Sequence, residues 1–240
     1  EYGHIFLREI ELIRNFLLQD KRLGLKNALE LSVGKGRLAL KIHKLFKSYL
    51  ATDISKEMLK ITKKSDASLN VKYADAENLK FAKSNSFDYV FCLASLVHYP
   101  NPERAIKEIS RVLKHGGKAV ISVDSNISLK RIIKKLINQH YSHRYKHFKP
   151  QGSDIFQVYS RKKLLNYFNA NNLKIQQVMH LGMIVPIKYQ TPNSKNKYFI
   201  LTPEITKRLR QISHVLDKVP ILNRFSTYQI YILEKNALQR

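Results

Sequence analysis

The first half of the chain alternates short apolar runs with segments of helical periodicity, and this alternation limits the fold more than any other feature. The apolar runs cover residues 27–33, 49–52, 71–74, 87–93 and 118–123. Strands that alternate with helices form parallel sheets covered by helices on both faces. The run over 87–93 is apolar almost throughout, as in a strand at the centre of such a sheet. We therefore predict an α/β fold built on a mostly parallel sheet.

Helix signals fill the spaces between these runs. Apolar residues repeat at helical spacing over 37–46 and again over 55–63. Asn101, followed by proline, is typical of a helix start, and we expect that helix to end at 113–115, before Gly116. Each predicted helix thus connects one strand to the next.

The second half of the chain is less regular. Its patterns predict a helix over 160–170, a strand over 173–178 and a terminal strand over 226–233. Four prolines interrupt residues 184–225, which we expect to be irregular and to form a lid or cap insertion over a ligand.

Charge is spread unevenly along the chain. The formal net charge is +25, and residues 125–240 hold 21 Lys and Arg against 4 Asp and Glu, whereas residues 1–124 hold 22 against 14. A helix predicted over 127–140 combines an apolar stripe with four basic residues, Lys130, Arg131, Lys134 and Lys135. The second half is therefore expected to meet an anionic substrate or an anionic surface such as a membrane.

Length and composition indicate one α/β domain over residues 1–240, with a ligand-binding core over 1–124 and basic lid segments at 125–151 and 184–225. No apolar run approaches the ~20 residues of a membrane span, and the first residues lack a secretory pattern. The one cysteine, Cys92, lies in an apolar run and predicts a buried thiol. We expect a cytoplasmic protein, with peripheral membrane contact as a possibility.

Glycines and a carboxylate follow the first two predicted strands. Gly34 and Gly36 lie in the first turn, where glycine lets the backbone approach a ligand closely. Asp53 ends the second strand, where its carboxylate can accept hydrogen bonds from both hydroxyls of a ribose. Each signal alone is common in ordinary turns and caps, but the two together predict a site for an adenosine-containing ligand.

A second interpretation of the first turn is a dinucleotide site, because Gly34 to Ala39 fits the G-x-G-x-x-A pattern of NAD enzymes. Glu30, at the tip of the first strand, argues against it. Its charge would repel a pyrophosphate but attract a cationic amino-acid tail.

The first turn resembles the first motif of the class I S-adenosylmethionine-dependent methyltransferases, especially the small-molecule branch called type 11. Glu30, Gly34 and Gly36 match this motif, and Ser32 stands where the family has its first glycine. Residues 86–90 and 111–117 resemble later motifs of the same family, the second with histidine in place of proline.

This resemblance covers residues 27–123 and implies a fold and a donor site. The implied fold is a Rossmann-like, seven-stranded sheet in the order 3-2-1-4-5-7-6, with an antiparallel last strand. The resemblance implies that Asp53 binds the ribose of S-adenosylmethionine and that residues 75–77 border its adenine. The full implied donor site comprises Glu30, Ser32, Gly34, Gly36, Asp53, Ile54, Met58, Asp75, Ala76, Glu77 and Leu93.

The sulfonium of this donor already makes its methyl group electrophilic, so the reaction depends on alignment more than on catalytic side chains. His98, after the fourth strand, is the candidate general base for a hydroxyl acceptor, and a packing or capping role is the alternative. The resemblance favours a small, lipid-like or natural-product acceptor, methylated at O, N or C. The basic second half leaves RNA as an alternative acceptor, and Ser32 leaves a catalytically inactive donor-binding protein as a third.

Three histidines, His140, His143 and His147, would share one face of a helix. Neither an acidic residue nor a cysteine accompanies them, and aromatic and basic residues lie between them. We therefore predict a basic aromatic surface or lid there and no metal site, with an ordinary solvated helix face as the alternative.

Overall fold

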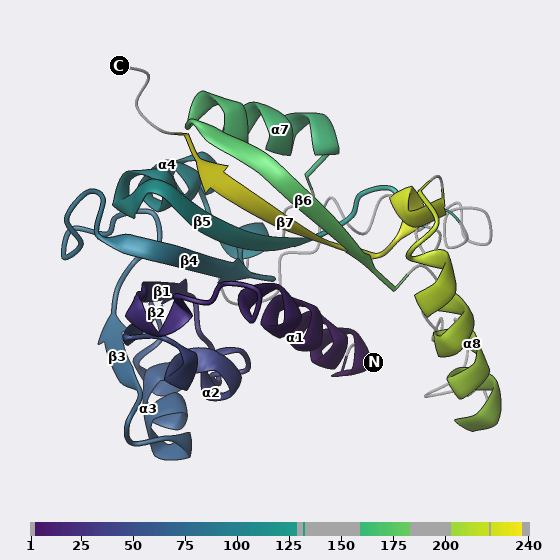
Figure 1. Ribbon diagram of the computed structural model, residues 1–240, viewed down its shortest axis with the longest axis horizontal. Coiled ribbons are helices and arrows are strands. Elements are labelled where there is room, and N and C mark those ends of the chain that lie inside the picture. The colour runs from purple at the N-terminus through teal and green to yellow at the C-terminus, as the bar shows by residue number, and fades with distance from the viewer. Residues whose placement is uncertain (1–2, 129–131, 133–158, 183–202, 221, 237–240) are drawn as a thin grey trace, which may run out of the picture.

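A computed structural model describes residues 3–128, 132, 159–182, 203–220 and 222–236. Seven strands form one sheet in the order β3-β2-β1-β4-β5-β7-β6, which confirms the predicted order (Figure 1). The strands are β1 (Asn27–Leu31), β2 (Ser48–Asp53), β3 (Asn70–Tyr73), β4 (Phe87–Leu93), β5 (Leu113–Asp124), β6 (Leu173–Leu181) and β7 (Tyr228–Lys235). The first five strands pair in parallel, and β7 runs antiparallel to both of its neighbours, as expected for the last strand.

Helices cover both faces of this sheet. The helices α1 (Gly3–Leu17), α2 (Ala39–Ile42) and α3 (Lys56–Ser65) pack on one face, and α4 (Pro102–Val112) and α7 (Arg161–Ala170) pack on the other. Short 3-10 helices join these elements: η1 (Leu23–Leu25), η2 (His43–Leu45), η3 (Leu96–His98) and η4 (Leu222–Phe225). The single helix predicted over 37–46 is thus divided into α2 and η2.

The central strand β4 shows why a sheet covered on both faces needs an almost continuous apolar run. Phe91 and Leu93 lie in the core between the sheet and α1 to α3, whereas Val90 and Cys92 lie in the core under α4 and α7. Because successive side chains of a strand point to opposite faces, both sets must be apolar.

Helix α1 is an element that the sequence-based predictions do not include. Ile5, Glu9, Ile13 and Leu17 recur every four residues along it, and all four are at most 2% exposed. Residues at this spacing lie on one face of a helix. A carboxylate within the stripe hides the pattern, because Glu9 reads as a polar position in the sequence.

The expectation that the fourth helix extends to 113–115 is wrong. Helix α4 ends at Val112, and Leu113 already has extended dihedral angles and pairs with Phe87 of β4. Leu113 is fully buried under the sheet face that α4 covers. Strand pairing and burial therefore determine the conformation of Leu113, although local helical spacing continues past it.

The expectation of an irregular segment over 184–225 is also wrong for part of its length, since α8 (Pro203–Leu216) is helical. Pro203 stands at the first position of the helix, where no backbone amide is needed, and Pro220 follows the end of the helix. These two prolines therefore delimit a helix. In Figure 1, α8 lies beyond the end of β6. The predicted basic helix over 127–140 lies outside the described residues, apart from 127, 128 and 132.

Replacing Ile13 by alanine should lower the free energy of unfolding by about 2–5 kcal/mol, because the side chain is completely buried against the sheet. Leu7→Ala, on the same helix, is the matched control: Leu7 is 68% exposed, and its loss should cost no more than about 0.5 kcal/mol. Urea unfolding followed by circular dichroism measures both values. Equally small losses would contradict the packing of α1 on the sheet.

Candidate functional site

The carboxyl ends of β1 and β4 mark the point where the strand order changes direction. β1 pairs in parallel with β2 on one side and with β4 on the other. The chain first builds outward to β3 and then returns to β4 on the opposite side of β1. Ligands of open α/β sheets bind in the crevice at such a point.

The turn after β1 has three residues in the left-handed region. The φ angles are 52° at Ser32, 55° at Gly34 and 80° at Gly36. A Cβ atom at Gly36 would also come within 3.0 Å of the Thr62 side chain, so this position needs glycine for both conformation and space. Thr62 further holds the turn by donating a hydrogen bond of 2.7 Å to the Gly34 carbonyl.

Asp53 ties the ends of the first three strands together. Its Oδ2 accepts the Gly34 amide at 2.8 Å, and its Oδ1 accepts the Ser55 amide at 2.8 Å. Its backbone carbonyl accepts the Ala74 amide at 3.1 Å, at the end of β3. A carboxylate offers about four acceptor positions, so each oxygen keeps capacity for a further donor.

The neighbouring predicted residues lie at the same edge. Ile54, directly after β2, is 60% exposed, whereas Ala76 is buried. The Glu77 amide donates to Asp75 Oδ1 at 2.8 Å. Glu77 Oε1 accepts the Asn101 amide at 2.6 Å, which links the segment after β3 to the start of α4.

Three further predicted residues flank these. Met58 lies in the first turn of α3, where its amide donates to Ser55 Oγ at 3.3 Å. Leu93 ends β4 and is 7% exposed. His98 is exposed and belongs to η3, which follows β4. The predicted site residues thus come from one edge of the sheet and the segments that leave it.

Comparison with known proteins decides the class of this fold. Residues 29–121 match the family described as a methyltransferase domain. The ubiquinone/menaquinone biosynthesis C-methyltransferase of Rickettsia prowazekii is 38% identical over 117 residues, 44% of this chain and 46% of that protein. The ubiquinone biosynthesis O-methyltransferase of Xanthomonas oryzae pv. oryzae is 31% identical over 107 residues, 42% of this chain and 45% of that protein. The chain spans about half the length of the curated relatives it matches.

A solved structure extends the likeness to the whole sheet. Magnesium protoporphyrin IX methyltransferase from Synechocystis PCC 6803, crystallised with bound SAH, superposes with a TM-score of 0.62 at 13% identity, covering 95% of this chain and 83% of that chain. Residues 29–121 of the chain thus match a methyltransferase domain, as the sequence resemblance implied, and the sheet has the fold of this solved methyltransferase.

Glu30 of the methyltransferase domain is enclosed at the tip of β1. It is 4% exposed, and the Tyr49 hydroxyl donates to its Oε2 at 2.7 Å. Burial raises the pKa of Glu30 to about 7, although Tyr49 and the charge of Arg37 act in the opposite direction. Arg37 also forms an ion pair with Glu9 of α1 and lies 4.4 Å from the centre of the Phe6 ring. α1 is thereby joined to the first turn. A direct contact between Glu30 and a cationic tail stays a prediction.

Tyr99 is a site residue that the predictions do not include. Its hydroxyl lies 2.8 Å from Ser32 Oγ, although 67 positions separate the two residues. Local patterns carry no signal for such a pair. In sequence terms, the only hint was the substitution of a glycine by Ser32 in the first motif.

The later family motif over 111–117 serves the architecture of the methyltransferase domain. The Arg111 guanidinium donates to the Leu79 carbonyl at 3.0 Å, to the Ala82 carbonyl at 2.8 Å and to Glu108 at 2.7 Å. It therefore holds the connection between β3 and β4 against α4. Gly116, with φ 72°, lies at the amino-end edge of the sheet, away from the first turn.

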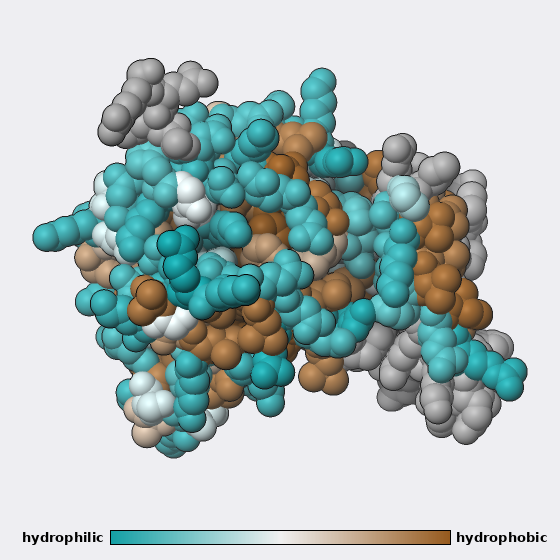
Figure 2. All heavy atoms as spheres, in the orientation of Figure 1, coloured by the Kyte–Doolittle hydropathy of each residue, from teal (hydrophilic) through white to brown (hydrophobic). Residues whose placement is uncertain are grey.

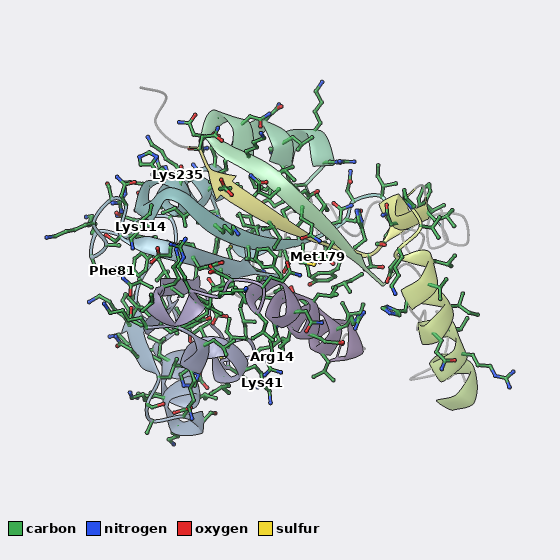
Figure 3. The ribbon with its side chains drawn as sticks, viewed as in Figure 1. Arg14, Lys41, Phe81, Lys114, Met179 and Lys235 are labelled. Carbon is green, nitrogen blue, oxygen red and sulfur yellow. The ribbon has the colours of Figure 1, made fainter. Side chains whose placement is uncertain are left out.

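Cavities in the described part of the chain also lie outside the first turn, and one of about 380 Å³ borders the segment after β3 and is lined by Asp75, Glu77, Asn78, Arg104, Lys107 and Glu108. Two others lie further from that segment. The larger, of about 470 Å³, opens at the amino ends of β4 and β5, and Lys114 in Figure 3 marks this edge. Lys26 and Lys114 both pair there with Asp88, and ligands of such sheets bind at the opposite edge. The smaller cavity, of about 260 Å³, lies at the carboxyl edge between α1, the end of β6 and α8, and is lined by Ile5, Arg8, Leu181, Gly182, Ser213, His214 and Asp217. The smaller cavity thus lies at the same edge of the sheet as the first turn, whereas the larger does not.

Cys92 is buried and unpaired by any disulfide, as predicted, and burial raises the pKa of its thiol. Among the described residues, no group of three or more His, Cys, Asp or Glu side chains is arranged to hold a metal ion. In the same part of the chain, no helix is long and apolar enough to cross a membrane. The three histidines between 140 and 147 lie outside the described residues.

Glu30 should make the protein less stable as the pH rises. An acid whose pKa is raised from 4.5 to about 7 by folding contributes stability that is complete below pH 4.5 and is lost as the pH approaches 7. The loss should reach roughly 2–3 kcal/mol between pH 5 and 8. Urea unfolding at several pH values should show this loss in the wild type and not in Glu30→Gln.

Glu108→Gln is the control for this experiment. The hydrogen bond from Arg111 lowers the pKa of Glu108, so its contribution is present above the usual range and is lost only in acid. Its replacement should shift stability by a constant amount between pH 6 and 8. Parallel profiles for the wild type and Glu30→Gln would contradict the raised pKa of Glu30.

Proposed function

We propose that this protein transfers a methyl group from S-adenosylmethionine and that the donor lies across the turn after β1. The observation that carries this proposal is the carboxylate of Asp53, which the Gly34 and Ser55 amides hold at the carboxyl end of β2. Two fixed hydrogen bonds orient the carboxylate and leave acceptor positions for the ribose hydroxyls. When bound, the donor supplies a methyl group made electrophilic by its sulfonium.

Other residues at this edge suit the remaining parts of the donor. Ile54 offers an exposed apolar side chain beside Asp53, against which an adenine can pack. The segment from Asp75 to Glu77 ends the neighbouring strand and is fixed to α4, so it can border the adenine on its other side. Glycines in the first turn let the backbone approach the amino-acid part, with Glu30, Met58 and Leu93 around it.

Asp53→Asn should weaken binding of S-adenosylhomocysteine about 10–100-fold, because hydrogen bonds to a charged acceptor contribute about 1.5–3 kcal/mol. Asp88→Asn is the matched control. Asp88 also accepts a backbone amide, that of Asn27 at 2.9 Å, but at the opposite edge of the sheet. Calorimetry should therefore find donor affinity unchanged in Asp88→Asn. Tight NAD binding, without any response to the sulfur ligands, would contradict the donor site.

The proposed acceptor is a small or lipid-like molecule that reaches the donor from the side of α8. The cavity of about 260 Å³ between α1, β6 and α8 lies at the same edge of the sheet as Asp53. Apolar side chains gather over α8 in Figure 2, where Ile212 and Val215 are exposed. The named relatives from Rickettsia prowazekii and Xanthomonas oryzae belong to ubiquinone biosynthesis, which also favours a lipid-like acceptor.

Positive charge adds to this proposal. The excess of basic residues in 125–240 favours an anionic acceptor or contact with an anionic membrane surface, where each basic residue contributes about 1 kcal/mol. We place His98 as the general base for a hydroxyl acceptor, because it is exposed on η3 directly after β4. RNA methylation is the alternative that the same charge favours.

Incubation with cell extract and isotopically labelled S-adenosylmethionine should place the label in the fraction extracted by organic solvent. His98→Gln should slow transfer to a hydroxyl by about a hundredfold or more. Label in tRNA or rRNA would overturn the small-molecule acceptor. Stoichiometric donor binding with no label in any fraction would identify a donor-binding protein without turnover.

A further inference from the structure

The turn after β1 holds a serine in a conformation that suits glycine. Ser32 has a φ of 52°, where the Cβ of any other residue is crowded by its own backbone. Strained residues of this kind persist when surrounding contacts hold them, and they gather at functional sites. The contacts of the Ser32 side chain therefore matter for what the turn does.

Hydrogen bonding fixes the direction of the Ser32 hydroxyl. Ser32 Oγ lies 2.8 Å from the Tyr99 hydroxyl, and Tyr99 donates its own hydrogen to Ser95 Oγ at 3.2 Å. A phenol has a single hydrogen, so when Tyr99 donates it to Ser95, Ser32 is the donor in the Ser32–Tyr99 bond. Tyr99 and Ser95 are 8% and 7% exposed, and water does not compete freely for these bonds. Ser32 Oγ consequently presents only lone pairs to any other group.

The Ser32–Tyr99 hydrogen bond also has a distinctive place in the fold. It crosses from the end of β1 to the residue after η3, on the β4 side of the point where the strand order changes direction. On the β2 side, Asp53 holds Gly34 of the same turn. The turn is therefore fixed from both sides of the crevice in which the donor is proposed to bind.

We propose that Tyr99 is a positioning residue that makes Ser32 a hydrogen-bond acceptor for the ammonium group in the amino-acid part of the methyl donor. The inference rests on the proposed donor site. An ammonium group has only hydrogens to offer, and an oxygen whose own hydrogen is engaged elsewhere is matched to it. Without the Tyr99 hydroxyl, the Ser32 hydroxyl can rotate and direct its hydrogen into the crevice.

Binding of two ligands tests this role. S-adenosylhomocysteine carries the ammonium group, and 5′-methylthioadenosine has the same nucleoside without the amino-acid part. Tyr99→Phe should weaken binding of the first about tenfold, the size of one charged hydrogen bond, and leave binding of the second unchanged. Ser32→Ala keeps the Cβ and should cause the same loss. In the double variant, Tyr99→Phe should add nothing to Ser32→Ala.

Tyr231→Phe is the control, because Tyr231 is fully buried and donates to Gln229 on β7, away from the first turn. It should change neither affinity. Equal losses for both ligands in Tyr99→Phe would reduce Tyr99 to a structural role, and additive losses in the double variant would overturn its action through Ser32. Asp53→Asn separates the two proposals: if it weakens both ligands while Tyr99→Phe weakens neither, only the role of Tyr99 fails. If Asp53→Asn weakens neither, the donor site itself is misplaced.

Discussion

The hydrogen bond from the Gly34 amide to Asp53 joins the two strand ends that define the donor side of this methyltransferase domain. Together with the Thr62 hydrogen bond to the Gly34 carbonyl, it holds the glycine-containing turn after β1 in place. The same bond orients the carboxylate that is proposed to bind the ribose. Further bonds around Glu30 join the same two strands, through the Tyr49 hydroxyl at 2.7 Å and Thr52 at 2.9 Å. The geometry of the site is therefore set by hydrogen bonds between the carboxyl ends of β1 and β2.

Charge acts on the site at two ranges. A net charge of +25 would repel a cationic donor at long distance, but salt screens exposed charges beyond a Debye length of about 8 Å. The first turn is accompanied by three carboxylates that are at most 7% exposed: Glu30 at the end of β1, Asp53, which accepts the Gly34 amide, and Glu9, which pairs with Arg37 of the turn. Arg37 compensates Glu9 directly. The local field at the first turn is therefore set by a few buried acids, whereas the basic excess acts on partners of the second half.

Sequence patterns were sufficient for a mostly parallel sheet covered by helices and for placing Asp53 at the end of β2, because the signals are local: alternating periodicities, turn glycines and a carboxylate at a strand end. The order of the strands came from the family resemblance, and the role of Asp53 stays a prediction. They were insufficient where distant residues decide. Leu113 is extended because it pairs with β4, and α8 is helical although prolines flank it. α1 was hidden by one buried carboxylate, Glu9, whose partner Arg37 lies 28 positions away. The pairing of Ser32 with Tyr99 likewise exists only in three dimensions.

The place of β7 between β5 and β6 affects how the chain can assemble. Among the described strands, β6 pairs only with β7, and 46 residues separate the end of β6 from the start of β7. A ribosome makes the chain from its amino end, so β6 and the helix before it emerge with no partner strand available. During that interval β5 has an open edge, and exposed edges invite pairing with other chains. In a nascent chain, the edges of β5 and β6 thus stay unpaired until β7 has been synthesised. Chaperone binding should matter most during that period.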